Sequence, residues 1–173
     1  SGNVVADVHG FMLERLRGHL REREFSPDEI ESVVCQNPTR IDLVIPRLDA
    51  VCAFRKLPEA AALAAANKRI QNILKKTAKV EAEIQVGLLH ENAERSLYEV
   101  VQRLAPQVEA GMKKQDYTAM LTLLASARTA VDEFFDKVMV MAEDHAVRDS
   151  RLALLKRLGD LMNQVADISK LAG

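Results

Sequence analysis

Apolar residues recur at three- and four-residue steps through most of the chain. In the first segment they occupy positions 4, 8, 11, 12, 16 and 20, a spacing that places them on one face of an α-helix. No segment keeps the two-residue alternation of a half-buried strand. We therefore expect an all-α fold, a helical bundle of about seven to eight helices in two packed parts. The expected helices cover residues 4–24, a short stretch between Pro27 and Asn37, a stretch between Thr39 and Leu57, 59–80, about 90–111, 117–127, about 128–141 and about 146–169.

Local start signals support several of these helices. Ser-Pro-Asp-Glu at 26–29 has the residues of a capping box, with Ser26 as the cap and Glu29 three positions later. We also expect Thr39 and Asp116 to cap the helices that follow them. Pro46 falls inside the third helix and predicts either a kink or a later start.

A segment containing Gly87 interrupts the helical pattern and divides the chain. We expect an N-terminal helical part at 1–80, whose clearest helix is 59–80, a connector at 81–88 and a C-terminal helical domain at 89–173.

Composition bounds the class of protein. The 173 residues are 48% hydrophobic and 28% charged, which is enough apolar material for a core and excludes a disordered chain. The net charge of −1 excludes a polycation, so any contact with nucleic acid must come from local segregation of charge. No apolar run approaches the roughly 20 residues that cross a bilayer. Cys35 and Cys52 form no CxxC pair, so we expect reduced thiols and a cytoplasmic location.

Catalytic and metal-binding motifs are missing from the sequence. His90-Glu91 begins like the zinc motif HExxH, but Glu94 stands where the second histidine belongs. There is no GxSxG nucleophile motif and no glycine-rich phosphate loop. We therefore expect no catalytic residue, no metal and no cofactor in this chain.

The helix expected at 59–80 carries an unrelieved positive charge. Residues 60–80 contain no acidic residue. At about 100° per residue, the basic side chains of this segment share roughly a third of the helix circumference, and its large aliphatic residues lie opposite. The basic residues are Lys68, Arg69, Lys75, Lys76 and Lys79. They either bind phosphate or form an ordinary solvated surface.

The segment AEDHAVRDSR (142–151) allows two interpretations. An acid–histidine site is one. The other, which we favour, is a helix start that Asp144 caps, with an ion pair between Asp144 and Arg148 across one turn. Arg148 and Arg151 then share a helix face and are weaker candidates for RNA contact.

Two longer stretches resemble a known family. FFDKVMVMAEDHAVRDSRLALLKRLGDLMNQVADISKL (134–171) and AANKRIQNILKK (65–76) closely resemble the C-terminal region of bacterial glycyl-tRNA synthetase beta subunits. The last part is similar to the helical anticodon-binding domain named for an Asp-Ala-Leu-Arg signature. The matching residues here are Asp144, Ala146, Val147 and Arg148, with His145 inserted and Val147 in place of leucine.

The resemblance implies a non-catalytic fragment of glycine–tRNA ligase. In the full enzyme, alpha and beta subunits attach glycine to its tRNA with ATP and magnesium, and this region holds the glycine tRNA, including the anticodon. The alternative is a purely structural helical module for subunit or interdomain packing. The first hypothesis assigns tRNA contacts to Lys68, Arg69, Lys75, Lys76, Lys79, Arg148 and Arg151.

Overall fold

The expected all-α architecture is confirmed. The computed structural model describes residues 2–80 and 82–173, and within these ranges it contains helices and no strand. The α-helices are α1 (Gly2–Glu22), α2 (Pro27–Val34), α3 (Val44–Arg55), α4 (Ala60–Lys75), α5 (Asn92–Lys114), α6 (Tyr117–Ala125), α7 (Arg128–Lys137) and α8 (His145–Met162). Short 3₁₀ turns are η1 (Ile41–Leu43), η2 (Val86–Leu88) and η3 (Ile168–Leu171).

Helix starts mostly follow their local signals. The capping box forms before α2, because the Glu29 backbone N–H donates to Ser26 Oγ at 3.2 Å and the Ser26 N–H donates to the Glu29 carboxylate at 2.8 Å. Asp116 caps α6 as expected. The Thr39 cap is wrong, because η1 comes first and α3 begins at Val44. Pro46 then lies in the first turn of α3, where its missing N–H breaks no intrahelical bond.

Several helices end earlier than their apolar pattern predicts, and α4 and α8 show it most clearly. α4 stops at Lys75 rather than at residue 80. Just after this end, the Thr77 hydroxyl donates to the Leu74 carbonyl at 3.1 Å, a side-chain bond to the last turn of the helix. α8 stops at Met162 rather than residue 169. The side-chain oxygen of the next residue, Asn163, accepts hydrogen bonds from Asn67 Nδ2 at 2.6 Å and from the Ile168 backbone N–H at 3.2 Å. Both ends therefore depend on hydrogen bonds that hydrophobic periodicity does not encode.

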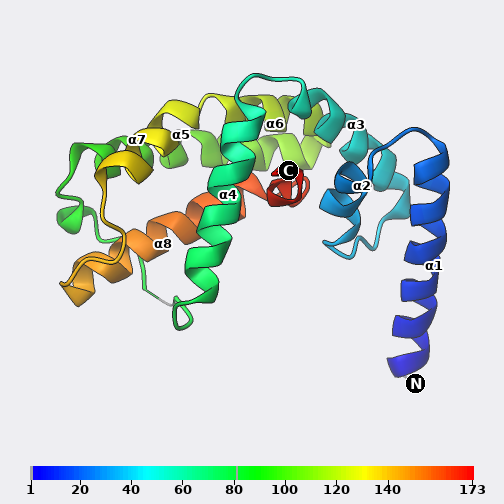
Figure 1. Ribbon diagram of the computed structural model, residues 1–173, viewed down its shortest axis with the longest axis horizontal. Coiled ribbons are helices and arrows are strands. Elements are labelled where there is room, and N and C mark those ends of the chain that lie inside the picture. Colours follow the sequence, from blue (N-terminus) through cyan, green and yellow to red (C-terminus); the bar gives the residue numbers. More distant parts are fainter. Residues whose placement is uncertain (1, 81) are drawn as a thin grey trace.

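The helices pack around one extended core. α5 contacts α6, α7 and α8, while α3 packs on α6, and α4 crosses α8 and also contacts α7 and η3 (Figure 1). η3 contacts α2 as well, and the Asp167 backbone N–H donates to the Ser32 carbonyl at 2.7 Å. The largest fully buried side chains include Phe54, Leu63, Ile70, Leu97, Leu121, Phe134 and Leu154. The division of the chain at 81–88 stays a prediction, and the basic helix α4 packs with the part that follows it.

The first helix is buried over only part of its length. Leu13 and Leu20 are 5% and 1% exposed, where α1 meets α2. The N-terminal half extends away from the other helices (Figure 1). Large apolar side chains in this N-terminal part are 50–72% exposed, namely Val4, Val5, Val8, Phe11 and Met12.

Candidate nucleic-acid interface

The basic residues of α4 and the turn after it lie at the surface. Lys68, Arg69, Lys75, Lys76 and Lys79, which we call the basic surface, are all exposed. On the opposite side of α4, Leu63 and Ile70 are 1% and 0% exposed. Within residues 2–80 and 82–173, no acidic side chain pairs with Lys68, Lys75 or Lys76. These three ammonium groups are therefore available to an anionic partner.

A groove joins one end of the basic surface to the start of α8. Lys79 lies beyond the end of α4, so the helical periodicity that grouped it with Lys68 does not apply there. The fold nevertheless places Lys76 and Lys79 beside Arg148 in a groove of about 490 Å³. Three of the predicted contact residues, from two elements far apart in sequence, thus line one concave surface.

A basic residue that the sequence analysis missed lies at the other end. Lys170, from η3, lines a groove of about 240 Å³ together with Lys68 and Lys75. Lys68 and Lys76 also border a neighbouring groove of about 490 Å³ beside Ala172. No local pattern could have indicated Lys170, because its neighbours in space are about 100 residues away in the chain. The positive surface therefore extends from η3 to α8.

Arg69 has a packing role as well as an exposed charge. Its guanidinium lies 4.4 Å from the centroid of the Phe135 ring, a distance at which the cation is attracted to the aromatic face. This contact joins α4 to α7. Arg69 therefore has a packing contact within the fold in addition to its exposed charge.

The start of α8 is a capped helix terminus. Asp144 accepts hydrogen bonds from the backbone N–H groups of Ala146 at 2.8 Å and Val147 at 3.1 Å. These bonds hold the pKa of Asp144 below its ordinary value. The expected pair of Asp144 with Arg148 does not form among the described residues. Arg148 instead contacts the His145 ring and donates to the Ala142 carbonyl at 3.4 Å.

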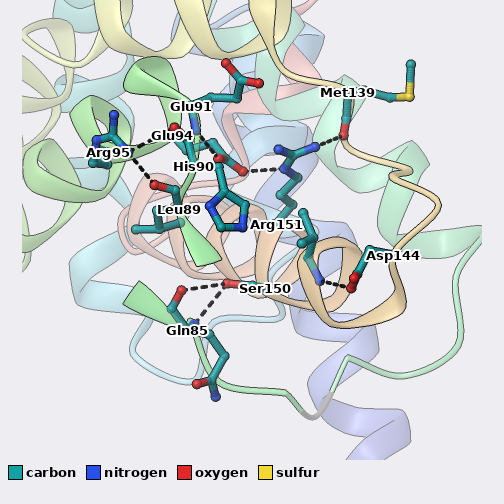
Figure 2. A network of polar contacts seen from close by, with 11 residues as sticks. Gln85, Leu89, His90, Glu91, Glu94, Arg95, Met139, Asp144, Ser150 and Arg151 are labelled. Carbon is teal, nitrogen blue, oxygen red and sulfur yellow. Dashed lines mark hydrogen bonds and ion pairs between the residues drawn. The ribbon is translucent and has the colours of Figure 1, made fainter. Parts of the chain in front are cut away.

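Arg151 is not displayed to a ligand. Its residue is 7% exposed, and its guanidinium forms an ion pair with Glu94, which is 0% exposed (Figure 2). A second guanidinium nitrogen donates to the Met139 carbonyl at 2.6 Å. This last bond holds the chain in an extended course just after α7, which ends at Lys137 rather than at residue 141. Burial and pairing argue against the predicted contact of Arg151 with RNA.

The same network fastens the connector to α8. The Glu91 backbone N–H donates to the Glu94 carboxylate at 2.8 Å, so that Glu94 serves both the N-terminus of α5 and Arg151. The Gln85 backbone N–H donates to the Ser150 hydroxyl at 2.9 Å (Figure 2). The segment from Gln85 to Glu94 is thereby held against α8.

The described residues offer little reactive chemistry. No group of three or more histidine, cysteine, aspartate or glutamate side chains is placed to hold a metal ion within them. Burial raises the pKa of the Cys35 and Cys52 thiols to about 11, so both stay protonated at neutral pH. None of the described helices is both long and apolar enough to traverse a bilayer.

Comparison with known proteins supports the resemblance seen in the sequence. The family model of the DALR anticodon binding domain matches residues 63–170. The chain is 54% identical over 168 residues to the glycine–tRNA ligase beta subunit of Ralstonia nicotianae, covering 97% of the chain and 24% of that protein. It is 52% identical over 172 residues to the one from Thiobacillus denitrificans, covering 99% of the chain and 24% of that protein.

The chain thus spans about a quarter of the length of these relatives. The family match begins within α4 and runs through α8 to η3, so it includes the basic residues of α4 and the capped start of α8. More than half of the chain is matched by a single family model, and the chain belongs to the family of DALR anticodon binding domains.

Proposed function

We propose that this chain is the tRNA-binding, anticodon-recognising C-terminal module of a glycine–tRNA ligase beta subunit. The family match and the identity of about half to beta subunits support this assignment. Attachment of glycine with ATP and magnesium, assembly with an alpha subunit and a cytoplasmic location belong to the proposed whole enzyme. The module itself binds the tRNA and does not carry the catalytic site.

The observation that carries the proposal is the basic surface with its bordering grooves. A tRNA presents phosphates at regular intervals, and lysine side chains neutralise them as point charges. Lys68, Lys75 and Lys76 are exposed and have no acidic partner among the described residues. The grooves to either side bring Arg148 and Lys170 to the same surface. A chain of net charge −1 thus has one surface suited to a polyanion.

Charge reversal at the end of the basic surface tests the proposal. In the complete synthetase, Lys75→Glu, Lys76→Glu and Lys79→Glu together should weaken tRNA binding and aminoacylation at low tRNA concentration. The plot of log K against log salt has a negative slope, and each phosphate contact adds about one to its magnitude. The magnitude should therefore decrease by roughly three. Affinity is measured by titration of labelled tRNA at several salt concentrations.

A control with the same charge change separates local contact from net charge. Lys56, Lys113 and Lys114 are exposed and lie at the ends of α3 and α5, and their replacement by glutamate should leave the salt slope within about one of the parent. The assignment of the basic surface is wrong if the two triple variants bind tRNA equally, or if the first binds as tightly as the parent.

One observation favours a structural role for α1 alone. Val5 and Phe11 are 72% and 67% exposed, and an apolar strip of this kind marks a contact surface. We infer that the N-terminal half of α1 packs against another part of a longer beta subunit. Replacing Val5, Val8 and Phe11 by serine should then destabilise the complete synthetase while leaving the unfolding temperature of this chain nearly unchanged. Equal effects on both would contradict the inference.

A further inference from the structure

A second groove lies directly beside the basic groove and has a different chemistry. Its volume is about 500 Å³. The lining comes from the segment after α4, from α5 and from α8, and consists of Val80, Ala82, Glu83, Ile84, Tyr98, Ala153, Lys156, Arg157 and Asp160. We propose that this groove binds a single unpaired nucleobase of the RNA, one that carries an exocyclic amino group. The inference rests on the proposed function and names the part of the surface that distinguishes bases.

The position of the groove suits a nucleotide whose phosphate is already held. The two grooves share Val80 and Ala82, so the one that contains Lys76, Lys79 and Arg148 adjoins the one that contains Tyr98. In a flexible RNA loop, phosphates lie on the outside of the strand and an unstacked base can turn away from them. A strand held on the first groove can therefore place a base in the second.

Tyr98 provides a stacking surface for that base. The residue is half-buried on α5, and its hydroxyl accepts a hydrogen bond from Gln102 Nε2 at 2.9 Å. The bond and the partial burial restrict the ring, which lowers the entropy lost on stacking. Ile84 and Ala153 add apolar lining beside it. Single-stranded nucleic acids are commonly held by this combination of an aromatic ring and a positive groove.

Arg157 offers the second planar group. It is exposed on α8 and lines the same groove. Within residues 2–80 and 82–173, its guanidinium has no hydrogen-bonding or ion-pair partner. A guanidinium plane stacks on bases as an aromatic ring does and adds a positive charge. Tyr98 and Arg157 together can stack on the two faces of a base, whichever base it is.

Asp160 supplies the preference for an amino group. Its Oδ2 lies 3.6 Å from Lys156 Nζ in an exposed ion pair, which leaves Oδ1 able to accept a further hydrogen bond. A carboxylate accepts from N–H donors and pairs well with the exocyclic amino group of cytosine or adenine. Uracil presents the O4 carbonyl oxygen in place of the cytosine amino group, and a carboxylate cannot accept a hydrogen bond from it. The groove should therefore discriminate against uracil.

A mutant cycle between protein and RNA tests the groove. The probe is the anticodon stem-loop of a glycine tRNA, in a series where one loop position at a time is abasic, titrated against the complete synthetase. At one position, loss of the base should weaken binding to the parent by about 5- to 150-fold. The penalty for losing that base should be clearly smaller in Tyr98→Ala and in Arg157→Ala than in the parent, because each variant has already lost one of the two stacking groups.

Two further variants sharpen the result. Tyr98→Phe keeps the ring and should retain the parent's response to the abasic position, and Asp160→Asn should reduce the preference for an amino base over uracil there. If Tyr98→Ala does not fold, the exposed Arg157→Ala decides the cycle alone. Abasic effects that are the same in the parent and in Arg157→Ala would overturn the base site while leaving tRNA binding intact. A parent that does not bind the stem-loop at any salt concentration would overturn the proposed function itself.

Discussion

At the scale of single residues, the buried pair of Glu94 and Arg151 is the most exacting contact in the molecule. Glu94 is 0% exposed and Arg151 7%. Charges removed from water in this way are tolerated only when each has its partner. The pair also receives the Glu91 N–H and donates to the Met139 carbonyl, so it connects α5, the chain after α7 and α8.

Removing either charge should leave the other buried and unpaired. Glu94→Gln or Arg151→Met alone is therefore expected to lower the free energy of unfolding by about 3–5 kcal/mol. The double variant should lose less than the sum of the two, because no unpaired charge remains. Urea denaturation followed by circular dichroism measures all three.

A neighbouring carboxylate serves as the control. Glu99 is exposed on the same helix, and Glu99→Gln should change stability by less than about 0.5 kcal/mol. Where Arg151→Met remains folded, its tRNA affinity and salt slope should equal those of the parent. A slope reduced by about one, as for a lost phosphate contact, would show that Arg151 touches RNA after all.

Residue roles were predictable from sequence where the interaction is local. The Asp144 cap and the Ser26–Glu29 capping box join groups two or three residues apart, so the sequence contains both partners in one motif. The spacing of Arg148 and Arg151 predicts RNA contact for Arg151, but it does not reveal the partner Glu94, which lies 57 residues earlier. Spacing along a helix indicates which face a residue shares, but it does not indicate what covers that face.

At the scale of elements, α5 and α6 meet at a position that requires glycine. A Cβ atom at Gly111 would clash with Met120 Cγ, and Met120 is 1% exposed, so its side chain has little space to move. No positive φ is involved at Gly111. The glycine is thus needed for the close approach of two helices rather than for its backbone freedom.

Alanine at two helical glycines should therefore have opposite effects. Gly111→Ala is expected to destabilise the chain by about 1–3 kcal/mol through overpacking against Met120, despite the higher helix propensity of alanine. Gly10→Ala, where nothing lies within 4 Å of the added atom, should stabilise by about 0.5–1 kcal/mol. Thermal denaturation of both variants checks the pair. Equal stabilisation by both would mean that α5 and α6 are less closely packed than described.

The existence of the helices was predictable, while their ends were less so. A periodic apolar face is enough to predict α4, and together with a capping residue it predicts α2 and α6. At the ends of α4 and α8, Thr77 donates to the Leu74 carbonyl of the last turn of α4, and Asn163 bonds to Asn67 on another helix. Thr39 failed as a cap because η1 intervenes before α3, and no residue pattern distinguishes a 3₁₀ turn from the first turn of an α-helix.

At the scale of the whole molecule, the C-terminal turn holds distant parts together. Asn67 and Asn163 exchange amide hydrogen bonds of 2.6 and 3.2 Å, and Gln71 Nε2 donates to Asp167 at 3.0 Å. The Asp167 N–H donates in turn to Ser32 on α2. α2, α4, α8 and η3 are thereby linked across the position of the predicted connector.

Hydrogen exchange should consequently show one cooperative unit. Amides of α2, α4 and α8 are expected to lose protection together, and those at the N-terminal end of α1 to exchange first, because they have few buried contacts. Asn163→Ala should lower protection in all three helices by a similar amount, about 1–3 kcal/mol. Exchange of α2 well before α8 in the parent would instead indicate two units that unfold separately.

The separation of charge on this molecule also has a kinetic consequence. The net charge is −1, and Lys68, Lys75 and Lys76 lie together on α4 with no acidic partner among the described residues, so positive potential is concentrated at this surface. An approaching polyanion then experiences a torque that turns the basic surface toward it before contact, which raises the proportion of productive collisions. Added salt should accordingly slow association much more than it speeds dissociation. The arrangement of charge thus orients the encounter, even though the sum of charge does not attract RNA.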